Sequence, residues 1–185
     1  MIIIYLFLSV CILIASVYDA TTKKIPNWIS LTIIVSGLSW NTFFVEGLGL
    51  KESGLGLIVG LLLMLLGHIF GSMGAGDVKL MAAIGSVAGF NKVLDVVLYS
   101  YMVMFVMAVI FIIVKGDLFK LLLRYKALLF GLFAGILSYQ KPDSSEAAGQ
   151  RLPLAPAIAL ATLYVLYHSQ ICNLEFMANL CHLQN

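Results

Sequence analysis

The sequence predicts an all-α fold: a polytopic membrane protein with six transmembrane helices and one amphipathic helix on the cytoplasmic membrane surface. Of its 185 residues, 62% are hydrophobic and 11% are charged, whereas a soluble domain averages about 25% charged residues. Because a chain of this length cannot bury so much apolar surface in one aqueous core, lipid must solvate the rest. The few charges also leave apolar runs of about 20 residues, the length that a transmembrane helix requires.

Six apolar runs supply the expected spans, within a single domain that covers residues 1–185. The runs are residues 1–18, 26–45, 53–71, 77–90, 96–114 and 153–171. We expect the first run to remain uncleaved, because no basic segment precedes it and no small-residue cleavage site precedes Asp19. Pro26 and Asn27 open the second run, and Pro153 opens the last. These positions suit the first turn of a helix.

The fourth run is short and opens with an acidic residue. A helix over residues 77–90 would be about 21 Å long at 1.5 Å per residue, while the hydrocarbon core is about 30 Å thick. We therefore expect residues 71–76 to enter the membrane, where non-helical backbone is tolerated only if protein buries it or it lines a water-filled cavity. Asp77 follows a glycine-rich turn, as an N-cap does. An ionisable group at such a cavity is also a candidate functional residue.

Basic residues predict the orientation of the chain. Residues 117–139 combine Lys and Arg with Leu and Phe, a composition typical of a helix that lies on the membrane surface. With the N-terminus outside, six spans leave Lys51 and Lys92 on the outer side and every other Lys and Arg on the cytoplasmic side. Cytoplasmic loops are enriched in such residues. We therefore predict an inner (plasma) membrane protein with Asp19 and Asp77 at its cytoplasmic face.

Asp19 and Asp77 are the acidic residues whose positions are hardest to explain as ordinary surface charges or helix caps. Asp19 lies at the C-terminal end of a span, where the helix dipole disfavours an anion, although it could cap the next turn or pair with Lys23. Two carboxylates brought together by helix packing do not both ionise readily and can share one proton. An aspartic peptidase requires such a pair, because one carboxylate takes a proton from water while the other protonates the carbonyl oxygen.

Other kinds of chemistry have little support. No basic tract is interleaved with aromatic residues, so we do not expect a nucleic-acid partner. The three cysteines, Cys11, Cys172 and Cys181, have no C-x-x-C spacing, which argues against a zinc site or a redox pair. His68 is more typical of a packed or interfacial histidine, because it lacks the partners that a general base requires.

Three motifs, in this order along the chain, resemble those of the type IV prepilin peptidases, a family of G-x-G-D intramembrane aspartyl peptidases. They are an aspartate followed by Ile-Pro-Asn (Asp19, Ile25, Pro26, Asn27), GAGDVKL (residues 74–80), and LPLAPAIAL (residues 152–160), which contains Pro153 and Pro156. The resemblance implies an enzyme that removes the short basic leader of prepilins or pseudopilins at the cytoplasmic membrane face. It implies no metal and no other cofactor.

The resemblance also implies roles for individual residues. Asp19 and Asp77 would be the catalytic pair, and Gly74 and Gly76 would shape the site. Lys79 has two interpretations: its side chain extends to the lipid headgroups from the end of a span, or it orients Asp77 or a substrate carbonyl. The first is the more common behaviour of a long basic side chain near a span end.

Several alternatives stay open. Larger family members carry an N-terminal segment with two C-x-x-C pairs and a methyltransferase activity. This chain resembles the short, peptidase-only branch often tied to Flp/Tad-type pili, so we do not expect methylation. Archaeal preflagellin peptidases share the same plan, and a peptidase with another substrate is a further option. The non-enzymatic alternative is a small transporter or pilus-assembly factor that uses Asp19 and Asp77 for proton or cation passage.

Overall fold

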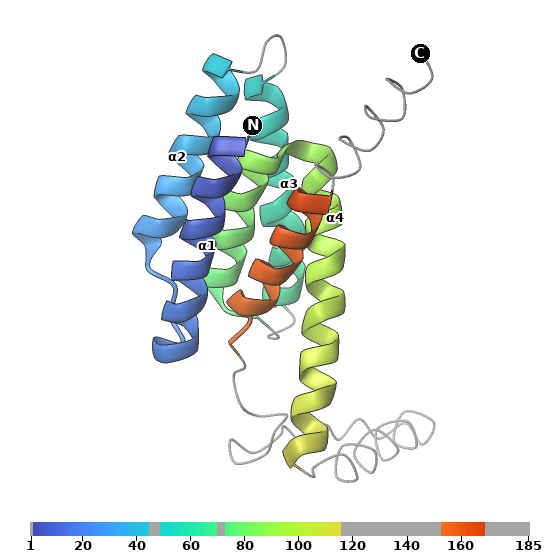
Figure 1. Ribbon diagram of the computed structural model, residues 1–185. Helices are drawn as coiled ribbons and strands as arrows, with labels where there is room; N and C mark the ends of the chain where they lie inside the picture. Colours follow the sequence, from blue (N-terminus) through green and yellow to red (C-terminus); the bar gives the residue numbers. More distant parts are fainter. Residues whose placement is uncertain (1, 45–48, 70–72, 116–152, 169–185) are drawn as a thin grey trace, which may run out of the picture. The chain divides into compact units, whose positions relative to one another are not determined.

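The computed structural model describes residues 2–44, 49–69, 73–115 and 153–168, and these residues are mainly helical (Figure 1). The helices are α1 (Ile2–Thr22), α2 (Asn27–Phe44), α3 (Gly49–Ile69), α4 (Ala75–Lys115) and a shorter fifth helix, Ala155–His168. The predicted all-α class is therefore confirmed. Only α1, α3 and α4 are long and apolar enough, among the described residues, to cross a membrane. Six spans are not supported, and the predicted surface helix over residues 117–139 lies outside the described residues.

The chain divides into two compact units. The first contains residues 1–103 and the segment from Pro153 onward, and the second contains Met104–Leu152. In the described part of the second unit, α4 continues to Lys115, whose ammonium lies 4.9 Å from the centre of the Phe111 ring. All of the predicted site residues belong to the first unit.

α4 departs from regular helix geometry at Gly89, where φ is 79° and ψ is 176°. Only glycine adopts this region readily, and the chain reverses direction there (Figure 1). Val93 consequently lies beside an earlier turn of α4: a Cβ on Gly85 would be 3.1 Å from the Val93 Cγ2 atom. Between the predicted spans over residues 77–90 and 96–114, the helix continues without a loop, and the chain reverses at a single glycine.

The first segment of α4 forms the core of the first unit. Residues 80–87 are buried on every side of the helix, as expected for a helix that is apolar all round. α3 packs against it through a face of small residues: its buried positions are Gly49, Ser53, Gly56, Gly60, Met64 and Gly67. A Cβ on Gly56 would overlap the Gly85 carbonyl oxygen. The absence of side chains thus lets the two backbones approach closely.

A buried polar network ties α2 and α3 to α4 just before the reversal. The Ser86 carbonyl oxygen accepts a hydrogen bond from Asn41 Nδ2 at 3.0 Å and another from Ser53 Oγ. The last carbonyls of a helix lack helical partners, so a break at Gly89 leaves carbonyls such as that of Ser86 in need of donors. The side chains of the two neighbouring helices supply them.

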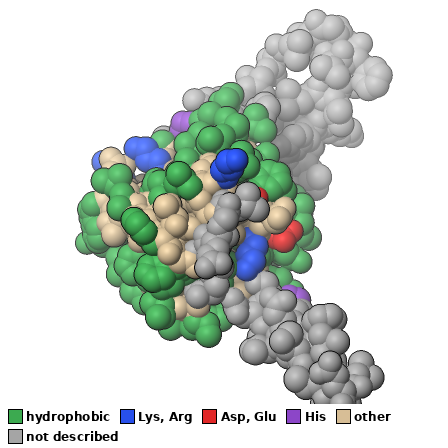
Figure 2. Space-filling model, turned by 90° about the horizontal axis from the view of Figure 1, so that it is seen from above, with side chains coloured by type: hydrophobic (Ala, Val, Ile, Leu, Met, Phe, Trp, Pro, Cys, Tyr) green, Lys and Arg blue, Asp and Glu red, His purple; other side chains and the backbone are tan. Residues whose placement is uncertain are grey.

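The fifth helix lies antiparallel to α1. Ser9 Oγ is 3.3 Å from Tyr167 Oη, while the opposite end of α1 approaches the start of the fifth helix. Tyr164 also packs edge-on against Tyr99 of α4, with ring centres 5.1 Å apart. Large apolar side chains remain exposed on the outer helix faces, and they dominate the described surface in Figure 2. Lipid is the solvent that such a surface requires.

Candidate active site

The end of α1 places Asp19 inside the bundle. α1 ends at Thr22, and Lys23 adopts a left-handed conformation with φ 53°. The Lys23 N–H donates to the Asp19 carbonyl oxygen at 2.9 Å, which is the αL type of helix cap. The cap fixes the last turn of the helix. The Asp19 side chain is only 7% exposed, so its carboxylate points into the protein and not toward solvent.

The Asp19 carboxylate caps the fifth helix. Its Oδ2 atom accepts a hydrogen bond from the Ala155 N–H at 3.0 Å. Ala155 is the first residue of that helix and needs an external acceptor. Pro156 has no N–H, and the Ala157 N–H already reaches the Leu154 carbonyl oxygen at 3.0 Å. The helix N-terminus therefore stabilises the negative charge of Asp19, and the start of the fifth helix is held directly against the predicted catalytic residue.

Asp77 is the third residue of α4, not its N-cap. The N-cap is Gly74, whose N–H donates to Asp77 Oδ2 at 3.1 Å, while the Asp77 N–H donates to the Gly74 carbonyl oxygen at 3.1 Å. The bond from the Gly74 N–H to the Asp77 side chain is one half of a capping box, and the second bond is a backbone one because glycine has no side chain. It corrects the expectation that Asp77 opens the helix, because residues 75 and 76 are already helical. A Cβ on Gly74 would lie 3.1 Å from Asp77 Oδ2.

The two aspartates converge from different helices. Asp77 is 6% exposed and Asp19 is 7% exposed, and the two carboxylates are close enough to interact electrostatically. Each has one oxygen bound to an N–H at a helix start. Asp77 Oδ1 is buried and has no hydrogen-bond partner among the described residues. One carboxylate oxygen is therefore free to bind a proton, water or a substrate atom.

The Ile-Pro-Asn motif packs against the glycine motif. A Cβ on Gly76 would lie 3.1 Å from Ile25 Cβ, so the absence of a side chain at Gly76 permits the contact. Lys79 Nζ donates to Asn27 Oδ1 at 3.0 Å, and both side chains are exposed. Pro26 contributes its carbonyl oxygen, which accepts the Ile29 N–H at 3.2 Å in the first turn of α2. Lys79 thus binds Asn27 and not Asp77.

The remaining candidate residues, His68 and Pro153, lie next to the motifs that carry the aspartates or their partners. His68 Nδ1 lies 2.8 Å from the Met73 carbonyl oxygen, which helps to fix the backbone just before Gly74. Pro153 precedes the fifth helix by two residues. Within the described ranges, no three His, Cys, Asp or Glu side chains come together as a metal site would require.

Sequence reasoning did not identify two of the groups that build the site. One is the Ala155 N–H, and the other is the Ile25 side chain against Gly76. A signal for the first was present, because Pro153 and Pro156 mark a helix start whose remaining N–H groups need acceptors. Ile25 belongs to the predicted Ile-Pro-Asn motif, but no signal points to its contact with Gly76, since that contact depends on how α2 packs.

Comparison with known families agrees with this arrangement. A sequence model of the type IV leader peptidase family matches residues 6–112, a range that includes Asp19, the Ile-Pro-Asn motif and the glycine motif. No curated protein gave a significant match, and no solved structure did. Because the matched range covers more than half of the chain, the protein belongs to the type IV leader peptidase family.

Proposed function

We propose that the protein is an aspartic endopeptidase that removes the short basic leader of a type IV prepilin or pseudopilin, with Asp19 and Asp77 as its catalytic residues. One observation carries the proposal: two buried carboxylates from different helices lie close enough to interact. Membership of the leader peptidase family supports peptidase activity in general. The geometry adds a reason to assign the chemistry to these two residues.

The pair can catalyse peptide hydrolysis with a single shared proton. The ionised carboxylate takes a proton from water as the water oxygen bonds to the carbonyl carbon, and the protonated carboxyl group gives its proton to the carbonyl oxygen. Cleavage of the C–N bond then transfers a proton to the leaving amine. Asp77 Oδ1 is suited to exchange a proton, because no described group binds it. The N–H donors at the two helix starts hold the other oxygens in place.

We assign the site to the cytoplasmic face of the membrane. Lys23, Lys24 and Lys79 are exposed at the same end of the bundle as the aspartates. Lysines and arginines concentrate on the cytoplasmic side of membrane proteins. With α1 ending at this face, the N-terminus lies outside, and the prepilin leader meets the site before it crosses the membrane.

Single substitutions test the proposal. Asp19→Asn and Asp77→Asn should each abolish leader removal from a co-expressed prepilin, measured by immunoblot of the two prepilin forms. Asp95→Asn is a matched control, because Asp95 is an exposed acidic residue on α4. All three variants should accumulate in the membrane at the wild-type level. Complete cleavage by either Asp19→Asn or Asp77→Asn would contradict the proposed catalytic pair.

Two further measurements separate the alternatives. Ion flux in proteoliposomes that depends on Asp77, without proteolysis of any prepilin, would favour the transporter function. Mass spectrometry of protein N-termini in a deletion strain identifies the substrate class. Unprocessed prepilins or pseudopilins are expected there, and unprocessed proteins of another kind would replace the proposed substrate.

A further inference from the structure

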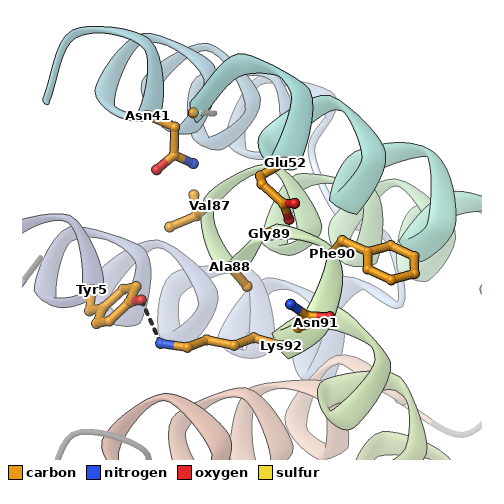
Figure 3. Close-up of a pocket in the computed structure, with 10 residues that line it drawn as sticks. Tyr5, Asn41, Glu52, Val87, Ala88, Gly89, Phe90, Asn91 and Lys92 are labelled. Carbon is orange, nitrogen blue, oxygen red and sulfur yellow. Dashed lines mark hydrogen bonds between the residues drawn. The ribbon is translucent and has the colours of Figure 1, made fainter. Parts of the chain in front are cut away.

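A cavity that contains charged and polar side chains lies at the end of the bundle opposite the aspartates. It has a volume of about 220 Å³, and the reversal at Gly89 forms part of its wall. Tyr5 enters from the first turns of α1, Asn41 from the end of α2, and Glu52 from the first turn of α3 (Figure 3). Asp19, in contrast, lies in the last turn of α1. The length of α1 therefore separates this cavity from the candidate active site.

Both signs of charge line the cavity. Lys92 extends from α4 toward α1, where its Nζ atom donates to Tyr5 Oη at 3.0 Å and lies 5.1 Å from the centre of the Tyr5 ring. Glu52 projects from α3 on the other side, beside Gly89 (Figure 3). A Cβ on Gly89 would lie 3.9 Å from Glu52 Oε2. Tyr5 thus orients the cation, and the first turn of α3 favours the anion through the helix dipole.

We propose that this cavity binds the headgroup of an amine-bearing zwitterionic phospholipid, with its phosphate at Lys92 and its ammonium at Glu52. The cavity is smaller than the roughly 300–1,000 Å³ of sites for drug-sized ligands, which favours a group of headgroup size. It lies at the end of membrane-length helices, the depth at which headgroups are found. The side-chain amides of Asn41 and Asn91 line the same cavity and offer donors and acceptors for the phosphate and glycerol oxygens.

The acyl chains have a surface to follow. Leu94, Leu98 and Met102, which succeed the reversal on α4, are exposed large apolar residues. A lipid whose headgroup occupies the cavity can therefore lay its chains along the outer surface of the bundle. A soluble phosphate ester would make no use of that surface, and this difference separates the two possible sources of the headgroup.

Binding to purified full-length protein in detergent tests the proposal. The probes are short-chain phosphatidylethanolamine, phosphatidylglycerol, which lacks the ammonium, and free phosphoethanolamine, which lacks the chains. Native mass spectrometry gives the affinities, and the lipid-dependent rise in melting temperature gives a second readout. We expect phosphatidylethanolamine to bind at least about tenfold more tightly than either of the other probes, a difference of about 1.4 kcal/mol.

Three variants assign the binding to the cavity. Lys92→Gln and Glu52→Gln should each weaken phosphatidylethanolamine binding about tenfold, whereas Lys51→Gln should leave it unchanged, because Lys51 is an exposed neighbour that does not line the cavity. If Lys92→Gln does not fold, a second variant replaces it. Tyr5→Phe removes the hydroxyl that orients the Lys92 ammonium and should also weaken phosphatidylethanolamine binding. Equal binding of phosphatidylglycerol, equal binding of free phosphoethanolamine, or unchanged affinity in the Glu52 variant would each overturn the proposal.

Discussion

Lys79 Nζ donates a hydrogen bond to Asn27 Oδ1 over 3.0 Å, which links the start of α4 to the first residue of α2 across 52 positions of sequence. Lys79 is two residues after Asp77, so the bond helps to fix the turn that carries this carboxylate. The structure therefore gives Lys79 a partner that neither sequence-based interpretation included. The Lys79 ammonium and the Asn27 side chain meet at the exposed edge of the candidate site.

The Lys79–Asn27 bond predicts non-additive kinetics. Lys79→Met and Asn27→Ala should each lower kcat/KM for prepilin cleavage by less than about tenfold, because a hydrogen bond to a charged group contributes roughly 1.5–3 kcal/mol at most and less where it is exposed. The double variant should be no slower than the worse single variant, since both remove the same bond. A much larger loss in Lys79→Met alone would show instead that Lys79 acts on the substrate.

The close contact between Gly76 and Ile25 can be tested by adding a side chain at Gly76 and then removing the one it meets. Gly76→Ala brings a Cβ within 3.1 Å of Ile25 Cβ, so the contact between the two motifs must widen, at a typical cost of about 1–3 kcal/mol. We expect prepilin cleavage to fall about tenfold and to recover when Ile25→Gly, which removes that Cβ, is added. Lack of recovery in the double variant, measured in the same cleavage assay, would mean that Gly76 is required for another reason.

The contact between α3 and α4 predicts that alanine is destabilising at one glycine and tolerated at another. Gly85→Ala would place a Cβ against the Gly56 carbonyl oxygen, a backbone atom that cannot rotate away, and should destabilise the protein by about 2 kcal/mol or more. Gly54→Ala is the matched control, because nothing lies within 4 Å of its Cβ position. It should be neutral or stabilising by up to about 1 kcal/mol. Melting temperatures of the purified variants check both, and equal melting temperatures would disprove the close contact.

The reversal at Gly89 predicts a conformational penalty. Gly89→Ala keeps the side chain small but must hold φ near 79°, a region that costs a non-glycine residue about 1–3 kcal/mol. Its melting temperature should fall, while Asn91→Ala, two residues away and exposed, should change it little. A melting temperature for Gly89→Ala that equals the wild-type value would indicate that the turn does not depend on glycine.

The sequence was informative about which residues form the site. Asp19, the Ile-Pro-Asn motif, the glycine motif and the LPLAP segment were all identified from the sequence. The structure brings the first three together with Ala155 at one end of the bundle. The two aspartates stand out because charge is rare in an apolar chain, whereas the other motifs were identified through their resemblance to those of the type IV prepilin peptidases. The catalytic roles of Asp19 and Asp77 stay predictions until cleavage is measured.

The contacts that join these motifs could not be predicted. The Asp19–Ala155 bond spans 136 residues, and no periodicity connects residues so far apart. Gly89 itself was not singled out, since a glycine that reverses a helix within one residue resembles any glycine in an apolar run. The position of Asp77 at the third residue of α4 was easier to predict from the sequence, because an acid three residues after a glycine N-cap fits the capping-box pattern.

The bond between Asp19 and Ala155 has a consequence for the order in which the protein matures. Asp19 leaves the ribosome early, while its hydrogen-bond donor is made 136 residues later. A nascent chain that has been translated only through α4 already contains both aspartates but lacks the helix that holds one of them. Completion of the candidate site therefore awaits the synthesis of the fifth helix, a segment distant in sequence from either aspartate.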